Sequence, residues 1–143
     1  MIFNDSSYRR YSYNYLVSKP VISVISYQLS VISISSALNT AVFEQNCIYV
    51  SAISVVEIAY LVERSRLPEE ALTLLVDTFS NPDTALEIVP LNLAIARTVR
   101  QIPRNVVPDM PDRIIAATAF YLNLPLVTRD LQIQRLTEIQ TIW

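Results

Sequence analysis

Short runs of branched apolar residues alternate with longer stretches of helical periodicity from Cys47 onward. Neighbouring parallel strands must be joined by crossovers of a dozen or more residues, which are usually helices. This alternation therefore predicts an α/β fold with a parallel sheet covered by helices on both faces. A chain of 143 residues is of single-domain size. We expect residues 47–143 to form that domain and residues 1–46 to be an atypical segment.

Local sequence signals place the expected elements along the chain. Pro68 suits the first turn of a helix, Asn81-Pro82 stops that helix, and Asn92 is a good N-cap for the next one. A run rich in alanine at residues 112–122 lets its helix lie close to a sheet. The expected strands are residues 48–50, 87–89, 125–128 and 139–143. The expected helices are residues 54–63, 68–80, 93–102, 112–122 and 130–136.

The chain contains no histidine and no glycine. The absence of histidine excludes a Ser-His-Asp triad, a Cys-His pair, a His-bound zinc ion and an imidazole general base. The absence of glycine excludes a P-loop and the dinucleotide-binding fingerprint, because both need a backbone without side chains near phosphate. Catalysis would therefore depend on carboxylates, hydroxyl groups or metal-bound water.

Charge and cysteine content narrow the function further. A formal net charge of −2 argues against coating nucleic acid by bulk electrostatics, so any nucleic-acid contact should be local and assisted by a metal ion. The single cysteine, Cys47, excludes an internal disulfide and adjoins an apolar run, which indicates a buried, inert thiol. These features suit a reducing, cytoplasmic compartment.

The first 46 residues follow a different pattern. They carry a tyrosine- and arginine-rich patch at residues 8–15 and the start of a seven-residue repeat at residues 23–33. The repeat is too short for a coiled coil, and its β-branched, serine-rich content favours extended chain. The serines also interrupt it too often for a signal peptide or a membrane span. Residues 21–34 are β-prone and uncharged, and are an aggregation hazard if they do not dock.

Three carboxylates stand where a parallel sheet would bring them together. Glu57 lies in the helix after the first strand, Asp112 opens the alanine-rich helix, and Asp130 follows the strand at 125–128. The carboxyl ends of parallel strands share one edge, where ligand sites form, so we expect these side chains to converge. Carboxylates held close together repel one another, and they either take up protons or bind a cation.

All-oxygen ligation selects a hard cation, Mg²⁺ or Mn²⁺. Such an ion polarises a phosphoryl oxygen and activates water, so the site predicts phosphodiester hydrolysis. Each acid also has a purely structural interpretation, because Asp112 would complement a helix dipole and Asp130 would cap the following helix. Arg113 and Arg129, each beside one of these acids, either hold substrate phosphates or form surface ion pairs.

Three segments carry these acids in order along the chain. They are VSAISVVEI at 50–58, PDRIIAATA at 111–119 and LVTRD at 126–130. They resemble the second, third and fourth acidic motifs of PIN-domain ribonucleases of the VapC toxin type. The resemblance covers about two-thirds of the chain, residues 48–143, and three motifs in register make it specific. It implies a three-layer α/β/α domain with a central parallel sheet.

The resemblance also implies an activity and partners. It implies a Mg²⁺- or Mn²⁺-dependent endoribonuclease that forms a homodimer and is held inactive by a cognate antitoxin covering the acidic pocket. On this analogy Glu57, Asp112 and Asp130 are the metal ligands. Thr128 orients Asp130 or a metal-bound water, and Asp109 is an acid of the outer shell.

The chain departs from the family pattern at its amino end. Family members begin with a short apolar strand that ends in Asp followed by Ser or Thr, and here Asp5-Ser6 has that form. The polar patch after it replaces the expected apolar helix, and we hypothesise that an insertion or frameshift has overwritten the first strand and helix. Asp5 is therefore a candidate fourth ligand only.

Two other functions stay open. A catalytically impaired remnant would keep only binding, to an antitoxin or to itself. A phosphatase with an aspartyl nucleophile is less well supported, because no strand is followed by an Asp-x-Asp pair.

Overall fold

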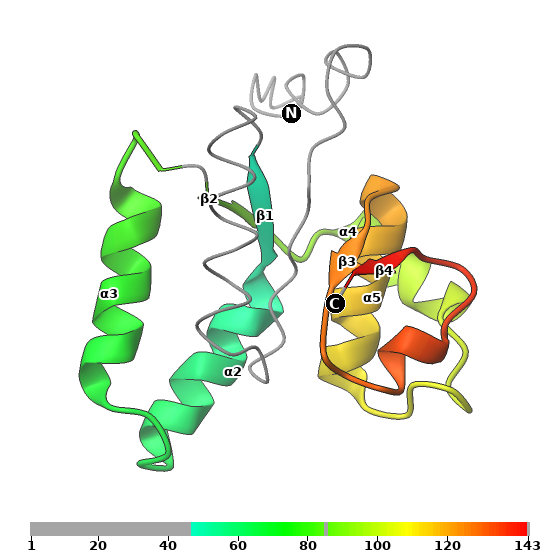
Figure 1. The fold of residues 1–143 in the computed structure, drawn as a ribbon, viewed down its shortest axis with the longest axis horizontal. Coiled ribbons are helices and arrows are strands. Elements are labelled where there is room, and N and C mark those ends of the chain that lie inside the picture. The colour runs from blue at the N-terminus through cyan, green and yellow to red at the C-terminus, as the bar shows by residue number, and fades with distance from the viewer. Residues whose placement is uncertain (1–46, 85, 143) are drawn as a thin grey trace, which may run out of the picture.

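The computed structural model describes residues 47–84 and 86–142 (Figure 1). Its first half runs through β1 (Ile48–Ser51), α2 (Ala52–Glu63), α3 (Glu69–Ser80) and β2 (Leu86–Val89). Its second half runs through α4 (Leu93–Thr98), the 3₁₀ turn η2 (Val99–Gln101), α5 (Met110–Leu122), β3 (Leu126–Val127), the 3₁₀ turn η3 (Ile133–Arg135) and β4 (Thr141–Ile142). The α/β fold class with parallel strands is confirmed.

The strands pair in parallel, and α2 and α3 form the crossover between the first two. In the register of β1 and β2, Ile48 lies opposite Leu86 and Ser51 opposite Val89. In the second pair Leu126 of β3 lies opposite Thr141 of β4. Within the described residues the strands thus form two separate two-stranded sheets, where a single central sheet was expected.

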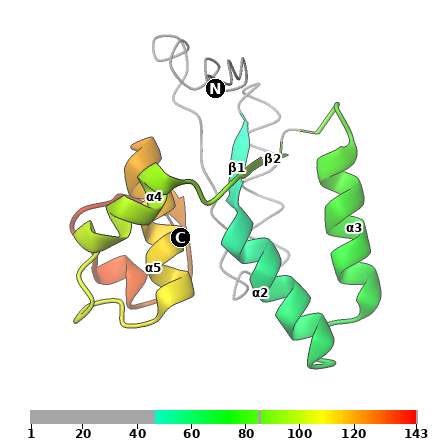
Figure 2. The same ribbon diagram turned by 180° about the vertical axis from the view of Figure 1, so that it is seen from behind.

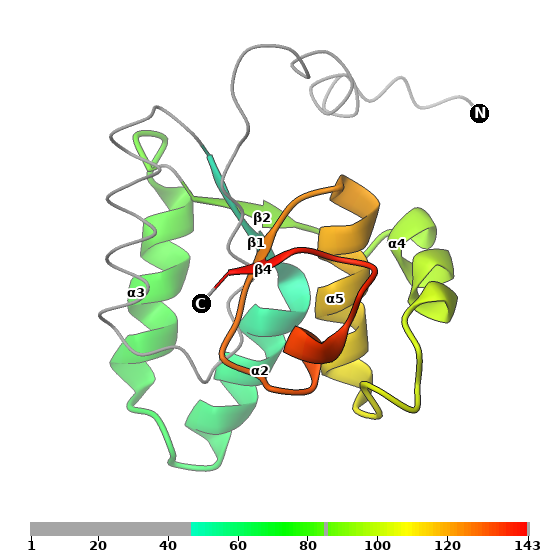
Figure 3. The same cartoon turned by 45° about the vertical axis from the view of Figure 1, so that its right-hand side comes forward.

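The main core surrounds α5. Figures 1 and 2 view it from opposite sides, with the β3·β4 pair in front of α5 in the first and α4 in front of it in the second. Figure 3 shows the same enclosure from the side. The alanines allow this close approach, because their small side chains let neighbouring backbones come near α5. Ile115, Ala116, Ala117 and Ala119 are completely buried.

A smaller core lies beneath the first sheet. Ile48 and Val50 of β1 are buried, and Phe79 of α3 and Leu86 of β2 pack against them. Tyr49, between them on β1, is partly buried against the main core, so side chains of β1 pack into both cores. The smaller core anchors α3 on the first sheet.

Two predicted helices are shorter in the structure. The helix expected at 93–102 is α-helical only to Thr98 and then tightens into η2. Ile102 is extended, with φ −86° and ψ 114°, because a proline disfavours the α conformation in the residue before it. The helix expected at 130–136 is reduced to the turn η3, since the backbone is extended again at Leu136.

The other boundaries differ by a few residues. Helix α2 begins at Ala52, two residues early, because the Ser51 hydroxyl accepts a hydrogen bond from the Ile53 amide at 3.4 Å. The predicted cap at Asn92 is confirmed, since its side-chain oxygen accepts from the Ile95 amide at 2.9 Å. The strand expected at 125–128 has two paired residues, Leu126 and Val127.

Without glycine, other residues adopt the left-handed turns. Among the described residues positive φ occurs at Ser65 (55°) and Asn123 (54°). Asn123 ends α5, and its amide donates to the carbonyl of Phe120 at 3.0 Å. Asparagine is the residue other than glycine that accepts this conformation most readily, so the end of α5 is well defined.

Two further expectations concern the thiol and the membrane. Cys47 was expected to be buried and is only partly so; desolvation, with Glu87 beside it, raises the pKa of its thiol to about 11, which keeps it protonated at neutral pH. In the described ranges, every helix is too short or too polar to cross a bilayer. The expectations about residues 1–46, including Asp5, lie outside the described residues.

We expect Ile115→Ala to lower the free energy of unfolding by about 2–5 kcal/mol, because it leaves a cavity in a fully buried site. Leu131→Ala is the matched control, since that side chain is 70% exposed, and its effect should stay within about 0.5 kcal/mol. Urea unfolding followed by circular dichroism measures both. Equal losses for the two variants would contradict a core centred on α5.

Candidate active site

The structure brings the predicted acids into mutual electrostatic range. Glu57 lies in the second turn of α2 and Asp112 in the first turn of α5, and these two helices pack against each other. Asp130 follows β3. Burial raises the pKa of Glu57 to about 7, and the charges of Asp112 and Asp109 contribute. Glu57 and Asp112 are therefore close enough to repel each other when both are charged.

Asp112 interacts electrostatically with each of the other acids, Glu57, Asp109 and Asp130. Burial, together with the charges of Asp130 and Asp109, raises its pKa to about 6. Asp109 occupies the N-cap position of α5, is exposed, and makes no capping hydrogen bond to that helix. Electrostatic interactions thus link Asp112 to Glu57, Asp109 and Asp130 around the first turn of α5.

The turn after β3 is held by its own polar groups. The buried Thr128 hydroxyl accepts a hydrogen bond from the Asp130 amide at 3.0 Å, and the Thr128 carbonyl accepts from the Gln134 side chain at 2.9 Å. Asp130 Oδ1 accepts from the amides of Gln132 at 2.7 Å and Ile133 at 2.9 Å. Asp130 therefore caps the following turn, as its structural interpretation predicted, and also interacts with Asp112.

Glu57 has an unsatisfied oxygen. Its Oε2 atom is buried and has no hydrogen-bond partner in the described part of the chain, and the same is true of Ser54 Oγ, one turn earlier on α2. A buried polar oxygen without a partner costs about 1–3 kcal/mol, so such atoms call for a proton, a water molecule or a cation. Sequence reasoning missed Ser54, although its spacing of three residues before Glu57 on an apolar helix was the available signal.

The group satisfies part of what a divalent cation requires. The ligand types are carboxylates, which suit Mg²⁺ or Mn²⁺, and the raised pKa values and the orphaned Glu57 oxygen both show a need for positive charge. Among the described residues, however, no three acidic or cysteine side chains lie close enough together to hold a metal ion as they stand. The chemistry fits a cation, and coordination would require the carboxylates to draw closer.

The two predicted arginines lie in different settings. Arg113 is half-buried, and its guanidinium donates to the backbone carbonyls of Val99 at 3.0 Å and Ile102 at 3.1 and 3.3 Å. This arrangement is neither of the two that the sequence suggested, because it joins the first turn of α5 to the end of η2. Arg129 is exposed.

Comparisons with known proteins support the same interpretation. A family model described as the PIN domain matches residues 23–139. A search of curated proteins found no match. The match spans most of the chain and includes all three acidic motifs.

Solved structures share the fold. The VapBC2 complex of Rickettsia felis, bound to a promoter DNA fragment, aligns with a TM-score of 0.65 and 21% identity, over 85% of this chain and 98% of that chain. The DNA-bound VapBC of Salmonella typhimurium gives 0.63 and 20%, over 87% and 98%. FitAcB of Neisseria gonorrhoeae gives 0.57 and 22%, over 85% and 95%. At these identities the likeness establishes the fold.

The raised pKa values predict how stability depends on pH without metal. A carboxyl group whose pKa is higher in the folded chain favours folding while it is protonated. The contribution of Glu57 is therefore lost as pH rises from about 4.5 to about 7, and that of Asp112 as pH rises from about 3.8 to about 6. We expect the Tm of the metal-free protein to fall across this range.

The variant Glu57→Gln should flatten this pH profile, because the amide cannot ionise. Glu63→Gln, on the same helix but exposed, is the control and should keep the wild-type slope. Differential scanning calorimetry in a chelating buffer measures the profiles. A wild-type Tm that rises over this interval would show that the acids are not coupled as described.

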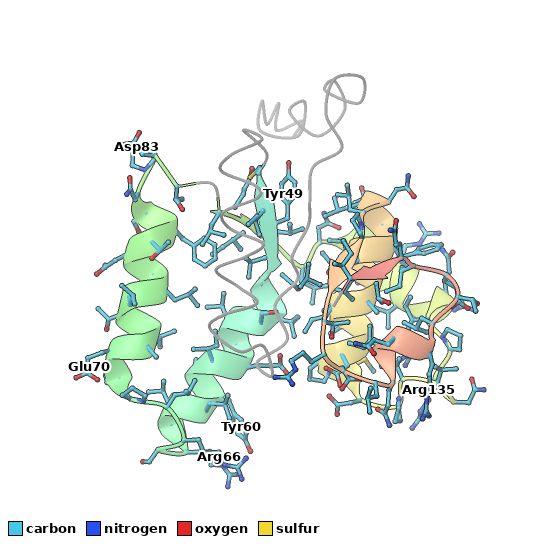
Figure 4. All side chains as sticks on the ribbon, in the orientation of Figure 1. Tyr49, Tyr60, Arg66, Glu70, Asp83 and Arg135 are labelled. Atoms are coloured by element: carbon cyan, nitrogen blue, oxygen red, sulfur yellow. The ribbon has the colours of Figure 1, made fainter. Side chains whose placement is uncertain are left out.

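Arg113→Met should cost about 1.5–3 kcal/mol of stability, because it leaves carbonyls at the end of η2 without a charged donor. Arg135→Met removes an exposed arginine, labelled in Figure 4, and should change stability by less than about 0.5 kcal/mol. Chemical denaturation compares the two. If both variants were equally stable, the tie between α5 and η2 would be unimportant.

Proposed function

Because the chain belongs to the PIN-domain family, a family of nucleases, we propose that it is a Mg²⁺- or Mn²⁺-dependent endoribonuclease and the toxin of a toxin–antitoxin pair. The observation that carries the proposal is the linked group of Glu57, Asp112 and Asp130. Two of these acids have strongly raised pKa values, and one has a buried oxygen without a partner in the described chain.

In this proposal Glu57, Asp112 and Asp130 hold the cation. When bound, it supplies charge stabilisation for a phosphoryl oxygen and a water molecule that is easier to deprotonate. The cation would also offset the repulsion among the carboxylates, and it would compete with the protons that burial and like charge favour on Glu57 and Asp112. Binding should therefore release protons near neutral pH.

Neighbouring residues hold Asp130 in place and add negative charge near the proposed cation site. The Thr128 hydroxyl and the η3 amides fix the backbone and one carboxylate oxygen of Asp130, which leaves little conformational freedom to lose on binding. Asp109 adds negative charge at the exposed rim, which attracts cations without being buried itself. Asp5 remains a proposed additional ligand.

The proposal extends to substrate and partners. RNA is the proposed substrate, cleaved at its phosphodiester bonds in the cytoplasm. The structural neighbours were solved as VapBC complexes with DNA, which supports an antitoxin as the partner of this chain. We also propose a homodimer, and a division between residues 1–46 and the domain of residues 47–143.

A second candidate function has one specific observation in its favour. In the described residues the acids do not form a ready-made metal site. A chain of this fold that had lost metal binding would keep only its association with an antitoxin or with itself.

Metal titration separates the two functions. We expect Mn²⁺ to bind the wild type, measured by calorimetry, and to raise its Tm at neutral pH. Asp112→Asn should weaken binding and RNA hydrolysis by about 100-fold or more, since even the loss of an outer-shell partner costs 10–100-fold. Asp83→Asn, an exposed acid labelled in Figure 4 in the turn after α3, is the control and should behave as the wild type.

A wild type that binds Mn²⁺ no better than Asp112→Asn, and cuts no RNA, would favour the binding-only function. Binding that is retained without hydrolysis would place the defect in substrate handling. The Asp83→Asn control excludes a general effect of lost negative charge.

A further inference from the structure

One stretch of this acidic chain carries only positive charge. Between Ile88 and Pro108 there are three arginines, Arg97, Arg100 and Arg104, and no aspartate or glutamate. The chain as a whole has a formal net charge of −2. The basic residues are thus concentrated on one segment, which the sequence analysis did not use.

The structure places two of these arginines, Arg97 and Arg100, beside one hollow. Arg97 ends α4 and Arg100 lies in η2, three residues later, so both project from neighbouring turns. They line a shallow hollow of about 440 Å³ together with Thr98 and Gln101. Arg97, Arg100 and Gln101 are exposed, while Thr98 is buried and donates from its hydroxyl to the Ala94 carbonyl at 2.9 Å. The exposed side chains of Arg97, Arg100 and Gln101 therefore surround the hollow over the end of α4 and η2.

Hydrogen bonds and helix packing connect this surface to the helix that carries Asp112. Arg113 binds the carbonyls of Val99 and Ile102 at the end of η2, and the residue before it is Asp112. Helix α4 also packs directly on α5, as Figure 2 shows. The basic hollow and the first turn of α5 are therefore held in a fixed relation by side-chain and helix contacts.

We propose that the surface of α4 and η2, through Arg97, Arg100 and Gln101, binds the phosphate backbone of the RNA strand whose cleavage the acidic site performs. Arg104 lies in the following loop, between η2 and α5, and is also exposed. The inference rests on the proposed nuclease function and adds the residues that bind its substrate.

The charges explain why such a surface is needed. RNA is a polyanion, and the site formed by Asp109, Asp112 and neighbouring acids repels it at short range. Basic residues that contact the phosphate backbone outside the acidic site would supply the attraction that the site itself lacks.

Other roles for these residues explain less of the arrangement. Arg97 and Arg100 lie in final helical turns, where a cation complements the helix dipole by about 0.3–1 kcal/mol. That effect accounts for neither the hollow nor Arg104. An acidic peptide would offer carboxylates to the arginines but no bases, whereas single-stranded RNA also presents unpaired bases that stack on side chains. Guanidinium planes also stack on bases.

The test is binding of a fluorescein-labelled single-stranded RNA to the full chain, followed by anisotropy in a chelating buffer so that no cleavage occurs. We expect Arg97→Gln/Arg100→Gln to weaken binding about tenfold at low salt. The slope of log affinity against log salt should decrease by about 1.4, since each phosphate contact on a single strand contributes about 0.7.

The matched control is Arg64→Gln/Arg66→Gln, which makes the same charge change at the far end of α2. Arg66 is labelled there in Figure 4, and Arg64 lies 5.0 Å from the ring centre of Tyr60. This control should bind RNA within about twofold of the wild type. Arg97→Lys/Arg100→Lys keeps both charges and should retain most of the salt slope, which shows that a loss in the glutamine variant is not a folding defect.

Equal loss in both glutamine variants, or no loss in either, would overturn the inference. So would binding of poly-glutamate by the wild type at the same surface with no binding of RNA, because the partner would then be an acidic protein segment. The chelated assay does not depend on hydrolysis. A wild type that binds RNA through these arginines but never cleaves it would therefore refute the nuclease proposal separately. If it does cleave, Arg97→Gln/Arg100→Gln should raise KM and leave kcat unchanged.

Discussion

Close packing around α5 is the interaction on which the described structure depends. The alanines on its buried faces allow α4, α2 and the β3·β4 pair to approach the same helix. Because Asp112 stands in the first turn of that helix, the packing also decides which acids meet. Glu57 arrives on α2 and Asp130 on the turn after β3. The acidic site is thus assembled by hydrophobic contacts between elements distant in the chain, since the carboxylates themselves repel one another.

The same repulsion that would favour cation binding lowers the stability of the folded chain. Burial and like charge disfavour ionised Glu57 and Asp112, and both terms lower the stability of the metal-free chain near neutral pH. The fold tolerates this cost because the core around α5 is large compared with the site. Asp130 differs from these two acids. Its carboxylate accepts hydrogen bonds from two backbone amides, so it is held in place without a cation.

The sequence predicted the order of the elements, because apolar periodicity and strand–helix alternation are local signals. The metal-binding role of the acids stays a prediction. The sequence did not predict Arg113 as the link between α5 and η2, because its partners are backbone carbonyls eleven and fourteen residues away, which leave no pattern of side chains. The helix after Asn92 was predicted too long, since the effect of Pro103 on the preceding residue was not weighed. Ser54 was not predicted because its spacing from Glu57 is a weak signal by itself, and only the packing of α2 shows that its hydroxyl is buried.

Asn123 and Ser65 show how the absence of glycine affects the free energies of both the folded and the unfolded chain. A left-handed conformation costs a residue with a Cβ atom about 1–2 kcal/mol, and this chain accepts that cost in two described turns. In return every residue has a narrower range of conformations when unfolded, worth about 0.4–1 kcal/mol at each position where glycine would otherwise stand. The absence of glycine therefore lowers the conformational entropy of the unfolded chain, and this effect is distributed over the whole sequence.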